Sequence, residues 1–200
     1  MDILIFLNAL TALFVIIDPI GTSLIFNALT IDQTAREKFF QALKASLITA
    51  ALLILFGNYG ADLLSYLGIS INALKISGGL LLFYTAFQMI NSQLKFRVKG
   101  KVQDISVYPM SIPLLAGPGS LTVSILLFSN VETSVDQLAV FMAVILICVL
   151  TCLLMTGSVY VKKIVGKTGD EILRRFLGVL LAALAIQFIF DGVLAFLAKL

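Results

Sequence analysis

Histidine is absent from the 200-residue sequence, and cysteine occurs only twice, as Cys148 and Cys152. Two thiols four residues apart, without histidine support, make a poor metal site, because structural zinc sites draw on four ligands. A disulfide between them is not expected, since residues at this spacing on a helix lie side by side rather than facing each other. We therefore interpret both cysteines as small packing residues and expect no metal and no bound cofactor.

Charge is also scarce. Charged residues make up 12% of the chain, 60% of it is hydrophobic, and the mean hydropathy is +1.08. A soluble domain with one core cannot bury that much apolar surface, so the composition predicts an integral membrane protein. The net charge of +3 is spread over connections rather than gathered in one patch, which indicates no nucleic-acid partner. The sequence has no P-loop, and its acidic start lacks the basic leader of a signal peptide, so the first apolar segment is expected to be retained.

Six apolar segments separated by short polar connections run through the chain, at residues of about 3–29, 43–64, 71–91, 105–128, 137–160 and 174–198. Apolar runs of about 20 residues match the thickness of a bilayer and favour helices over the shorter, alternating strands of a barrel. We expect an all-α integral membrane fold with six transmembrane helices, forming a single membrane domain over residues 1–200.

The basic residues predict the orientation of this bundle. Twelve of the 14 fall in three connections on one side of the membrane: Arg36, Lys38, Lys44, Lys95, Arg97, Lys99, Lys101, Lys162, Lys163, Lys167, Arg174 and Arg175. The connection between the fourth and fifth segments is acidic, with Glu132 and Asp136. By the positive-inside rule, the basic connections face the cytoplasm and both termini face outward.

The chain also repeats itself. A displacement of 99 residues aligns Pro19 with Pro118, Gly79 with Gly178, and Gln88 with Gln187. The repeats cover residues of about 1–95 and 102–200. Because each repeat holds three helices, the second copy must insert upside down relative to the first. Inverted repeats are typical of transporters, in which the site lies near the midplane between broken helices.

The two aligned prolines lie well inside the first and fourth segments, in DPIGTS and AGPGS. Proline removes one backbone donor and clashes with the preceding turn, so we expect these helices to be broken at Pro19 and Pro118. Irregular backbone at this depth is tolerated where it is buried in protein or lines a cavity. The prolines are therefore interpreted as part of a binding site, with simple kinks that help packing as the alternative.

Asp18 precedes the first of these prolines. If the helix restarts at the proline, Asp18 becomes its N-cap, and its carboxylate bonds amides near Gly21 and Thr22. An acid inside the membrane is costly and is a functional candidate by default. Three roles stay open for Asp18: a structural cap, a substrate contact, or a protonation site used in coupling.

The second break differs, because Gly117 has no side chain with which to cap the helix. The amides around Gly119 and Ser120 are then open and form an anion site at a helix N-terminus. Such a cavity suits a zwitterion, with its carboxylate at this end and its ammonium drawn toward Asp18. The candidate substrate-binding residues are Asp18, Pro19, Gly21, Thr22, Ser23, Gly117, Pro118, Gly119, Ser120 and Thr122.

Four motifs in this order resemble the MarC-type integral membrane family, also classed as six-span neutral amino acid transporters. They are DPIG at 18–21, ISINALKISGGLLLF at 69–83, PLLAGPGSLT at 113–122 and FLGVLLAALAIQ at 176–187. The resemblance covers nearly the whole chain. It implies a protein of the cytoplasmic (inner) membrane of a bacterium or archaeon that moves small neutral amino acids such as glycine or alanine.

The resulting prediction is a secondary transporter with alternating access, and not an enzyme, because the chain offers no convincing nucleophile and base. A channel or a broad-specificity exporter of small molecules built on the same broken helices is the alternative. Coupling to H⁺ or Na⁺ stays open, as do the preferred amino acid, the direction of transport and a homo-oligomeric assembly.

Overall fold

The computed structural model describes residues 3–91, 104–131 and 133–197, and this part of the chain is built of helices without strands. The elements are α1 (Ile3–Ile17), α2 (Pro19–Leu29), α3 (Ala35–Tyr66), α4 (Ile71–Ile90), η1 (Ser106–Leu115), α5 (Pro118–Ser129), α6 (Ser134–Thr156) and α7 (Ser158–Leu197). The all-α prediction is therefore confirmed. Glu132, Lys199 and the basic residues of the third connection, Lys95, Arg97, Lys99 and Lys101, lie outside the described residues.

Both predicted helix breaks are present. One separates α1 from α2, which begins at Pro19, and the other separates η1 from α5, which begins at Pro118. The second interrupted segment is the more irregular, because its two parts meet at 59° and η1 itself leaves helical geometry at Tyr108 and Ile112. Each of these residues precedes a proline, and the proline ring disfavours helical geometry in the residue before it.

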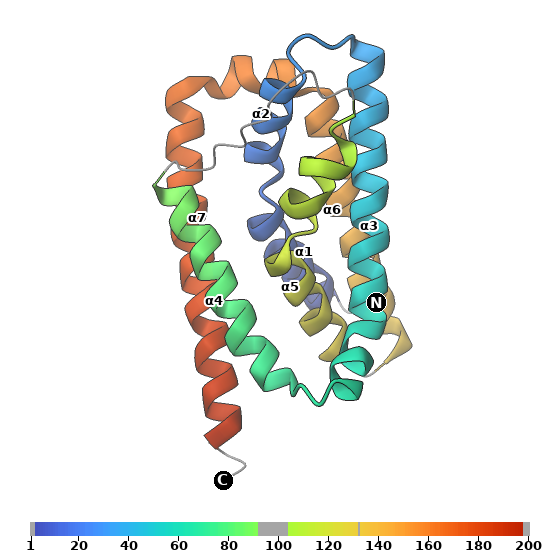
Figure 1. The fold of residues 1–200 in the computed structure, drawn as a ribbon, viewed down its shortest axis with the longest axis vertical. Coiled ribbons are helices and arrows are strands. Elements are labelled where there is room, and N and C mark those ends of the chain that lie inside the picture. Colours follow the sequence, from blue (N-terminus) through green and yellow to red (C-terminus); the bar gives the residue numbers. More distant parts are fainter. Residues whose placement is uncertain (1–2, 92–103, 132, 198–200) are drawn as a thin grey trace.

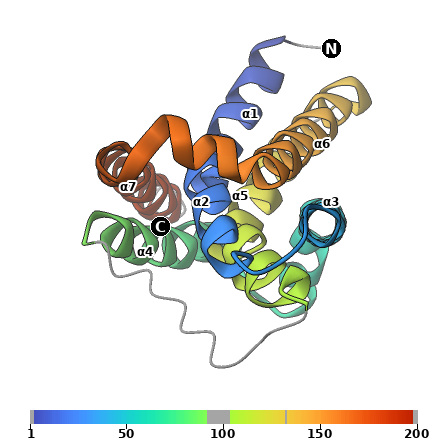
Figure 2. The same cartoon turned by 90° about the horizontal axis from the view of Figure 1, so that it is seen from above.

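The two broken segments lie in the middle of the bundle. Seen along the long axis, α4 and α7 run side by side at one flank, and α3 and α6 form the opposite flank (Figure 2). The α1–α2 segment packs on α6 and α7, and the η1–α5 segment packs on α3 and α4. Large side chains from this central region are fully buried, among them Leu13, Phe26, Met110 and Leu115. The breaks are thus enclosed by protein on both sides.

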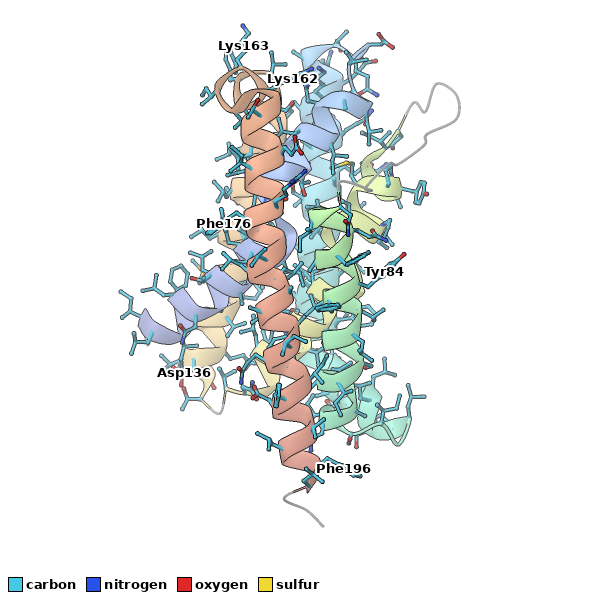
Figure 3. All side chains as sticks on the ribbon, turned by 90° about the vertical axis from the view of Figure 1, so that its left-hand side faces the viewer. Tyr84, Asp136, Lys162, Lys163, Phe176 and Phe196 are labelled. Atoms are coloured by element: carbon cyan, nitrogen blue, oxygen red, sulfur yellow. The ribbon has the colours of Figure 1, made fainter. Side chains whose placement is uncertain are left out.

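The outer surface of the bundle is apolar. Tyr84 on α4 and Phe176 and Phe196 on α7 project away from the helices (Figure 3), and more than half of each side chain is exposed. Exposed apolar side chains cover much of the length of α3, α4, α6 and α7. A surface of this kind suits lipid and not water, as expected for an integral membrane protein.

Four helical stretches are long and apolar enough to cross a membrane: Ile3–Leu29, Ala35–Tyr66, Ser134–Thr156 and Arg175–Leu197. A fifth is added if the bent pair Ser106–Leu115 and Gly119–Ser129 is taken as one span. Within the described residues, α4 does not meet the same test, and it carries Lys75 and Gln88 in its 20 residues. The structure shows a multi-pass helical protein, but the expected count of six spans is not confirmed.

The connection between the fifth and sixth predicted segments is itself helical. α7 runs from Ser158 to Leu197 as two helices joined at a kink, and its part long and apolar enough to span a membrane, Arg175–Leu197, agrees with the predicted sixth segment at about 174–198. It changes direction at Gly166, where φ is 64°, a value that glycine adopts without steric cost. The part before Gly166 lies across the end of the bundle, and the part after it runs along α4 (Figure 1).

The two ends of the bundle differ in charge. Lys162 and Lys163 lie at one end, and Asp136 and Phe196 lie toward the other (Figure 3). The start of α1 and the end of α7 both fall in the half of the molecule away from the first part of α7, which carries the two lysines (Figure 1). This placement agrees with the predicted topology, and the assignment of the lysine end to the cytoplasm remains a prediction from the positive-inside rule.

Candidate functional site

Asp18 caps the second half of the first broken helix, as the sequence predicts. Its Oδ1 accepts a hydrogen bond from the Gly21 amide at 2.9 Å, and the residue is only 8% exposed. The Thr22 amide instead bonds the main-chain carbonyl of Asp18, at 2.8 Å. Asp18 has φ 45° and ψ 68°, a left-handed conformation that aspartate tolerates better than most residues because its short polar side chain bonds locally.

Gly21 is required by this cap. A Cβ atom built on Gly21 would lie 2.1 Å from Oδ2 of Asp18, far inside van der Waals contact. The absence of a side chain at this position therefore lets the carboxylate settle over the first turn of α2. The capping hydrogen bond therefore requires both the Asp18 carboxylate and the missing side chain at Gly21.

The second break lacks such a cap. Gly117 is the N-cap of α5, and because it has no side chain it makes no side-chain capping hydrogen bond. A Cβ on Gly117 would lie 2.4 Å from the carbonyl oxygen of Pro113, so glycine permits the chain to turn tightly. The predicted difference between the two helix starts is therefore present in the side chains: one start is capped by an acid, and the other is not.

The start of α5 also touches both neighbouring segments. A Cβ on Gly119 would lie 2.6 Å from Cδ2 of Leu82 on α4 and 2.9 Å from Cδ1 of Ile16 on α1. Ile16 stands two residues before Asp18, so the two breaks lie close to one another in the core. The structure thus brings the Asp18 and Gly117 motifs, which are about 100 residues apart in sequence, into one region.

A hydroxyl group bridges each break in the same way. The Thr22 hydroxyl donates to the carbonyl of Ile17 at 2.9 Å, and the Ser120 hydroxyl donates to the carbonyl of Leu115 at 2.6 Å. Ile17 and Leu115 are the last residues of α1 and η1, where carbonyl groups lose their regular helical partners. Thr22 and Ser120 therefore hold the two halves of each segment together.

The remaining predicted residues have mainly structural surroundings. Ser23 is fully buried and donates to the carbonyl of Ile20 at 2.7 Å, within its own helix. Thr122 packs against α4, because a Cβ on Gly78 would lie 2.2 Å from its Cγ2. Pro19 is buried at the first position of α2, and Pro118 occupies the same position of α5.

A small internal cavity adjoins both breaks and was not predicted from the sequence. It is too small to hold a water molecule and is lined by Ile17, Ser46, Thr49, Leu115, Cys148 and Thr151. Ser46 and Thr49 belong to α3, whereas Cys148 and Thr151 belong to α6. The available signal in the sequence was a pair of hydroxyl residues three apart in an apolar segment, which places them on one face of a helix.

A larger apolar groove of about 250 Å³ lies between α3 and α6. Its walls include Leu43, Leu47 and Leu153, and it shares Ser46 and Cys148 with the internal cavity. These two residues therefore separate the inner, hydroxyl-lined space from the groove. Both cysteines are free thiols, as the sequence predicts.

The start of η1 is fastened to α3 by polar contacts near the end of the bundle. The Lys44 ammonium lies 2.6 Å from Oδ2 of Asp104, and Gln41 accepts a hydrogen bond from the Ile105 amide at 3.2 Å. Hydrogen bonds from Lys44 and from Ser106 lower the pKa of Asp104 to about 2 from its usual 3.8. These contacts fix the position from which the chain enters the second broken segment.

Comparison with known proteins gives a consistent result. The family model described as "MarC family integral membrane protein" matches residues 3–197. A UPF0056 membrane protein of Methanocaldococcus jannaschii is 31% identical over 96% of this chain and 98% of its own. A UPF0056 membrane protein of Archaeoglobus fulgidus is 35% identical over 94% and 91% of the two chains, and YvbG, a UPF0056 membrane protein of Bacillus subtilis, is 30% identical over 90% of each. No solved structure matches.

Proposed function

Because this chain belongs to the MarC family of integral membrane proteins, we propose that it is a secondary transporter of small neutral amino acids. Its substrates are zwitterions of the size of glycine or alanine. They cross the cytoplasmic membrane of a prokaryote through a site between the two broken helices. The proposal is for a carrier that binds and releases its substrate unchanged, and not for an enzyme.

The observation that carries this proposal is the difference between the two helix starts. Asp18 places a carboxylate on the first turn of α2, whereas Gly117, the N-cap of α5, has no side chain with which to cap that helix. The N-terminus of a helix attracts anions, and a carboxylate attracts an ammonium group. A zwitterion satisfies both requirements at once, with its carboxylate near Gly119 and Ser120 and its ammonium toward Asp18.

The packing of the helices supports two inverted repeats as the framework for alternating access. The α1–α2 segment packs on α6, and its counterpart η1–α5 packs on α3, the counterpart of α6. Likewise α4 contacts α5, and α7 contacts α2. Each of these contacts therefore corresponds to another one when every helix is replaced by its counterpart in the other repeat. In the proposed mechanism, one repeat rocks against the other around the central site.

Uptake into proteoliposomes tests the proposal. The purified protein should carry labelled glycine or alanine, with saturation and with preference for one enantiomer of alanine. Flux that neither saturates nor distinguishes enantiomers would point instead to a channel or a broad-specificity exporter.

Competition tests the proposed carboxylate contact. Glycinamide and methylamine keep the amino group of glycine but lack its carboxylate. They should compete roughly ten- to hundredfold more weakly than glycine, because charge-assisted hydrogen bonds contribute about 1.5–3 kcal/mol. Competition as strong as that of glycine itself would contradict a carboxylate site at α5.

A further inference from the structure

The hydroxyl groups of Ser46 and Thr49 are buried without a hydrogen-bond partner among the described residues. Ser46 is 5% exposed and Thr49 is 1% exposed, and both line the internal cavity beside the two breaks. A buried hydroxyl that lacks a partner destabilises a fold by about 1–3 kcal/mol. Two such groups on one cavity therefore indicate that something binds there in a functional state.

Their lack of partners is unusual for this chain. Other hydroxyls in the middle of helices bond back to the carbonyl four residues earlier, as Thr11 does to Leu7 and Thr151 does to Ile147. Two further buried side-chain oxygens lack partners in the described part of the chain, Oε1 of Gln33 and Oγ of Ser158. Gln33 lies in the connection before α3, Ser158 is the first residue of α7, and neither lines a space between α3 and α6. Ser46 and Thr49 are mid-helix residues that face one common space.

The cavity offers mainly acceptor oxygens. Thr151 uses its single O–H on the carbonyl of Ile147 at 2.7 Å, so its hydroxyl presents only lone pairs to any other partner. Ile17 and Leu115 contribute the C-terminal ends of α1 and η1, where the helix dipole is negative. None of the six lining residues is positively charged, and the buried acid Asp18 follows Ile17 directly. This environment favours a cation over an anion.

We infer that the cavity is a binding site for a small monovalent cation, sodium in size, held by the hydroxyl oxygens of Ser46, Thr49 and Thr151. Hard cations prefer oxygen ligands, and in broken-helix transporters the C-terminal ends of half-helices coordinate such ions. The space between the lining side chains leaves no room for the centre of a water molecule. A dehydrated sodium ion is smaller than a water molecule, whereas a potassium ion is about as large as one, so the space favours sodium.

The inference deepens the proposed function, because a cation beside the substrate site would couple its gradient to transport. That coupling rests on the proposed function, but the binding of the ion does not. Binding is therefore measured first, on the purified protein without any amino acid.

The primary measurement is the thermal unfolding midpoint in sodium, lithium, potassium and choline chloride at equal ionic strength. Sodium should raise the midpoint in a saturable way, and choline should not. Ser46→Ala and Thr49→Val should each weaken the apparent sodium affinity about ten- to hundredfold, because each removes one oxygen contact to a charge. Without sodium, both variants should be at least as stable as the wild type, because each removes an unpaired buried hydroxyl.

Thr11→Val is the matched control. Thr11 lies on α1 with its hydroxyl bonded to the carbonyl of Leu7, and it is exposed on the outside of the bundle. This variant should keep the full response to sodium. The inference is overturned if choline chloride stabilises the protein as well as sodium chloride does, or if both cavity variants respond to sodium like the wild type.

A second measurement reports on the cavity itself and does not depend on stability. Cys148 lines both the cavity and the outer groove, so a bound ion should slow its reaction with a small thiol reagent. In a Cys152→Ala background, sodium should slow this labelling, and Thr49→Val should abolish the protection. Labelling that is indifferent to sodium in the folded protein contradicts an ion at this place.

Measurements of sodium stabilisation and of transport together distinguish failure of this inference from failure of the proposed function. Saturable glycine transport that is independent of sodium, together with no stabilisation by sodium, removes the ion site and leaves the transporter. Stabilisation by sodium that is lost in Ser46→Ala, without transport of any amino acid, keeps the ion site and removes the proposed substrate.

Discussion

The hydroxyl of Thr22 donates to the carbonyl oxygen of Ile17 at 2.9 Å, five residues back across the first helix break. Ser120 makes the same bond to Leu115 across the second. In both halves of the chain, a hydroxyl group therefore makes a hydrogen bond across the break. The two halves differ in the residue at the N-cap. The cap residue, Asp18 in one half and Gly117 in the other, is the difference on which the polarity of the proposed site rests.

Substitutions at Asp18 should separate its charge from its role as a cap. Asp18→Asn keeps an N-cap side chain that tolerates the left-handed conformation, so its unfolding midpoint should stay close to that of the wild type. Asp18→Gly loses the cap but accepts φ 45° without steric cost, whereas Asp18→Ala loses the cap and is also strained by about 1–2 kcal/mol. The expected order of midpoints, measured in detergent, is Asn, then Gly, then Ala.

Transport by the same variants then assigns the role of the charge. If Asp18 attracts the substrate ammonium, Asp18→Asn should fold normally and transport poorly. Transport by Asp18→Asn at the wild-type rate would reduce Asp18 to a structural cap.

Gly79 should be intolerant of even a methyl group. A Cβ there would lie 2.7 Å from the carbonyl oxygen of Ala185 on α7, and main-chain atoms cannot move aside cheaply. We expect Gly79→Ala to destabilise the protein by about 1–3 kcal/mol through overpacking of α4 against α7. Gly169→Ala is the control, because the nearest atom to its Cβ is Cγ1 of Val165 at 3.2 Å, and alanine favours helix. A drop in the unfolding midpoint of equal size in both variants would contradict the packing explanation.

The ion pair between Lys44 and Asp104 should contribute a small, pH-dependent stabilisation. The side chains are 52% and 50% exposed, so water screens the pair and its contribution is about 0.2–1 kcal/mol. Because the pKa of Asp104 is lowered to about 2 in the folded state, this contribution is present above pH of about 4 and is lost as the pH falls toward 2. The difference in unfolding free energy between wild type and Asp104→Asn should therefore be constant near neutral pH and shrink below pH of about 4.

A double-mutant cycle with Lys44→Met isolates the pair. The coupling energy should disappear in acid and weaken in high salt. A coupling that persists at low pH would show that the two side chains contribute through packing rather than through charge.

Topology reporters test the orientation of the bundle. Fusions after Lys101 and after Gly166 should register as cytoplasmic, because the basic residues cluster at these connections. Fusions at Asn130 and at the C-terminal residue Leu200 should register as external. A cytoplasmic C-terminus together with a cytoplasmic Gly166 would rule out a final span between them and would contradict the inverted repeat.

The sequence by itself determined the features that depend on neighbours along the chain. Hydropathy predicted a helical protein that crosses the membrane several times, and the two prolines located both breaks, because proline acts on its own turn. The same local reasoning predicted the bond from the Gly21 amide to Asp18, three residues away. It did not predict that the connection between residues 160 and 174 is helical on both sides of a kink at Gly166, since polar and basic residues do not themselves end a helix.

The tertiary structure decided which groups meet across elements. Gln187, for example, donates a hydrogen bond to Asp191 within its own helix, α7. The missing partners of Ser46 and Thr49 became visible only once α3, α6 and the two breaks were packed around one cavity. Whether a hydroxyl is satisfied depends on distances between residues about 100 positions apart, and hydrophobic periodicity carries no information about those distances.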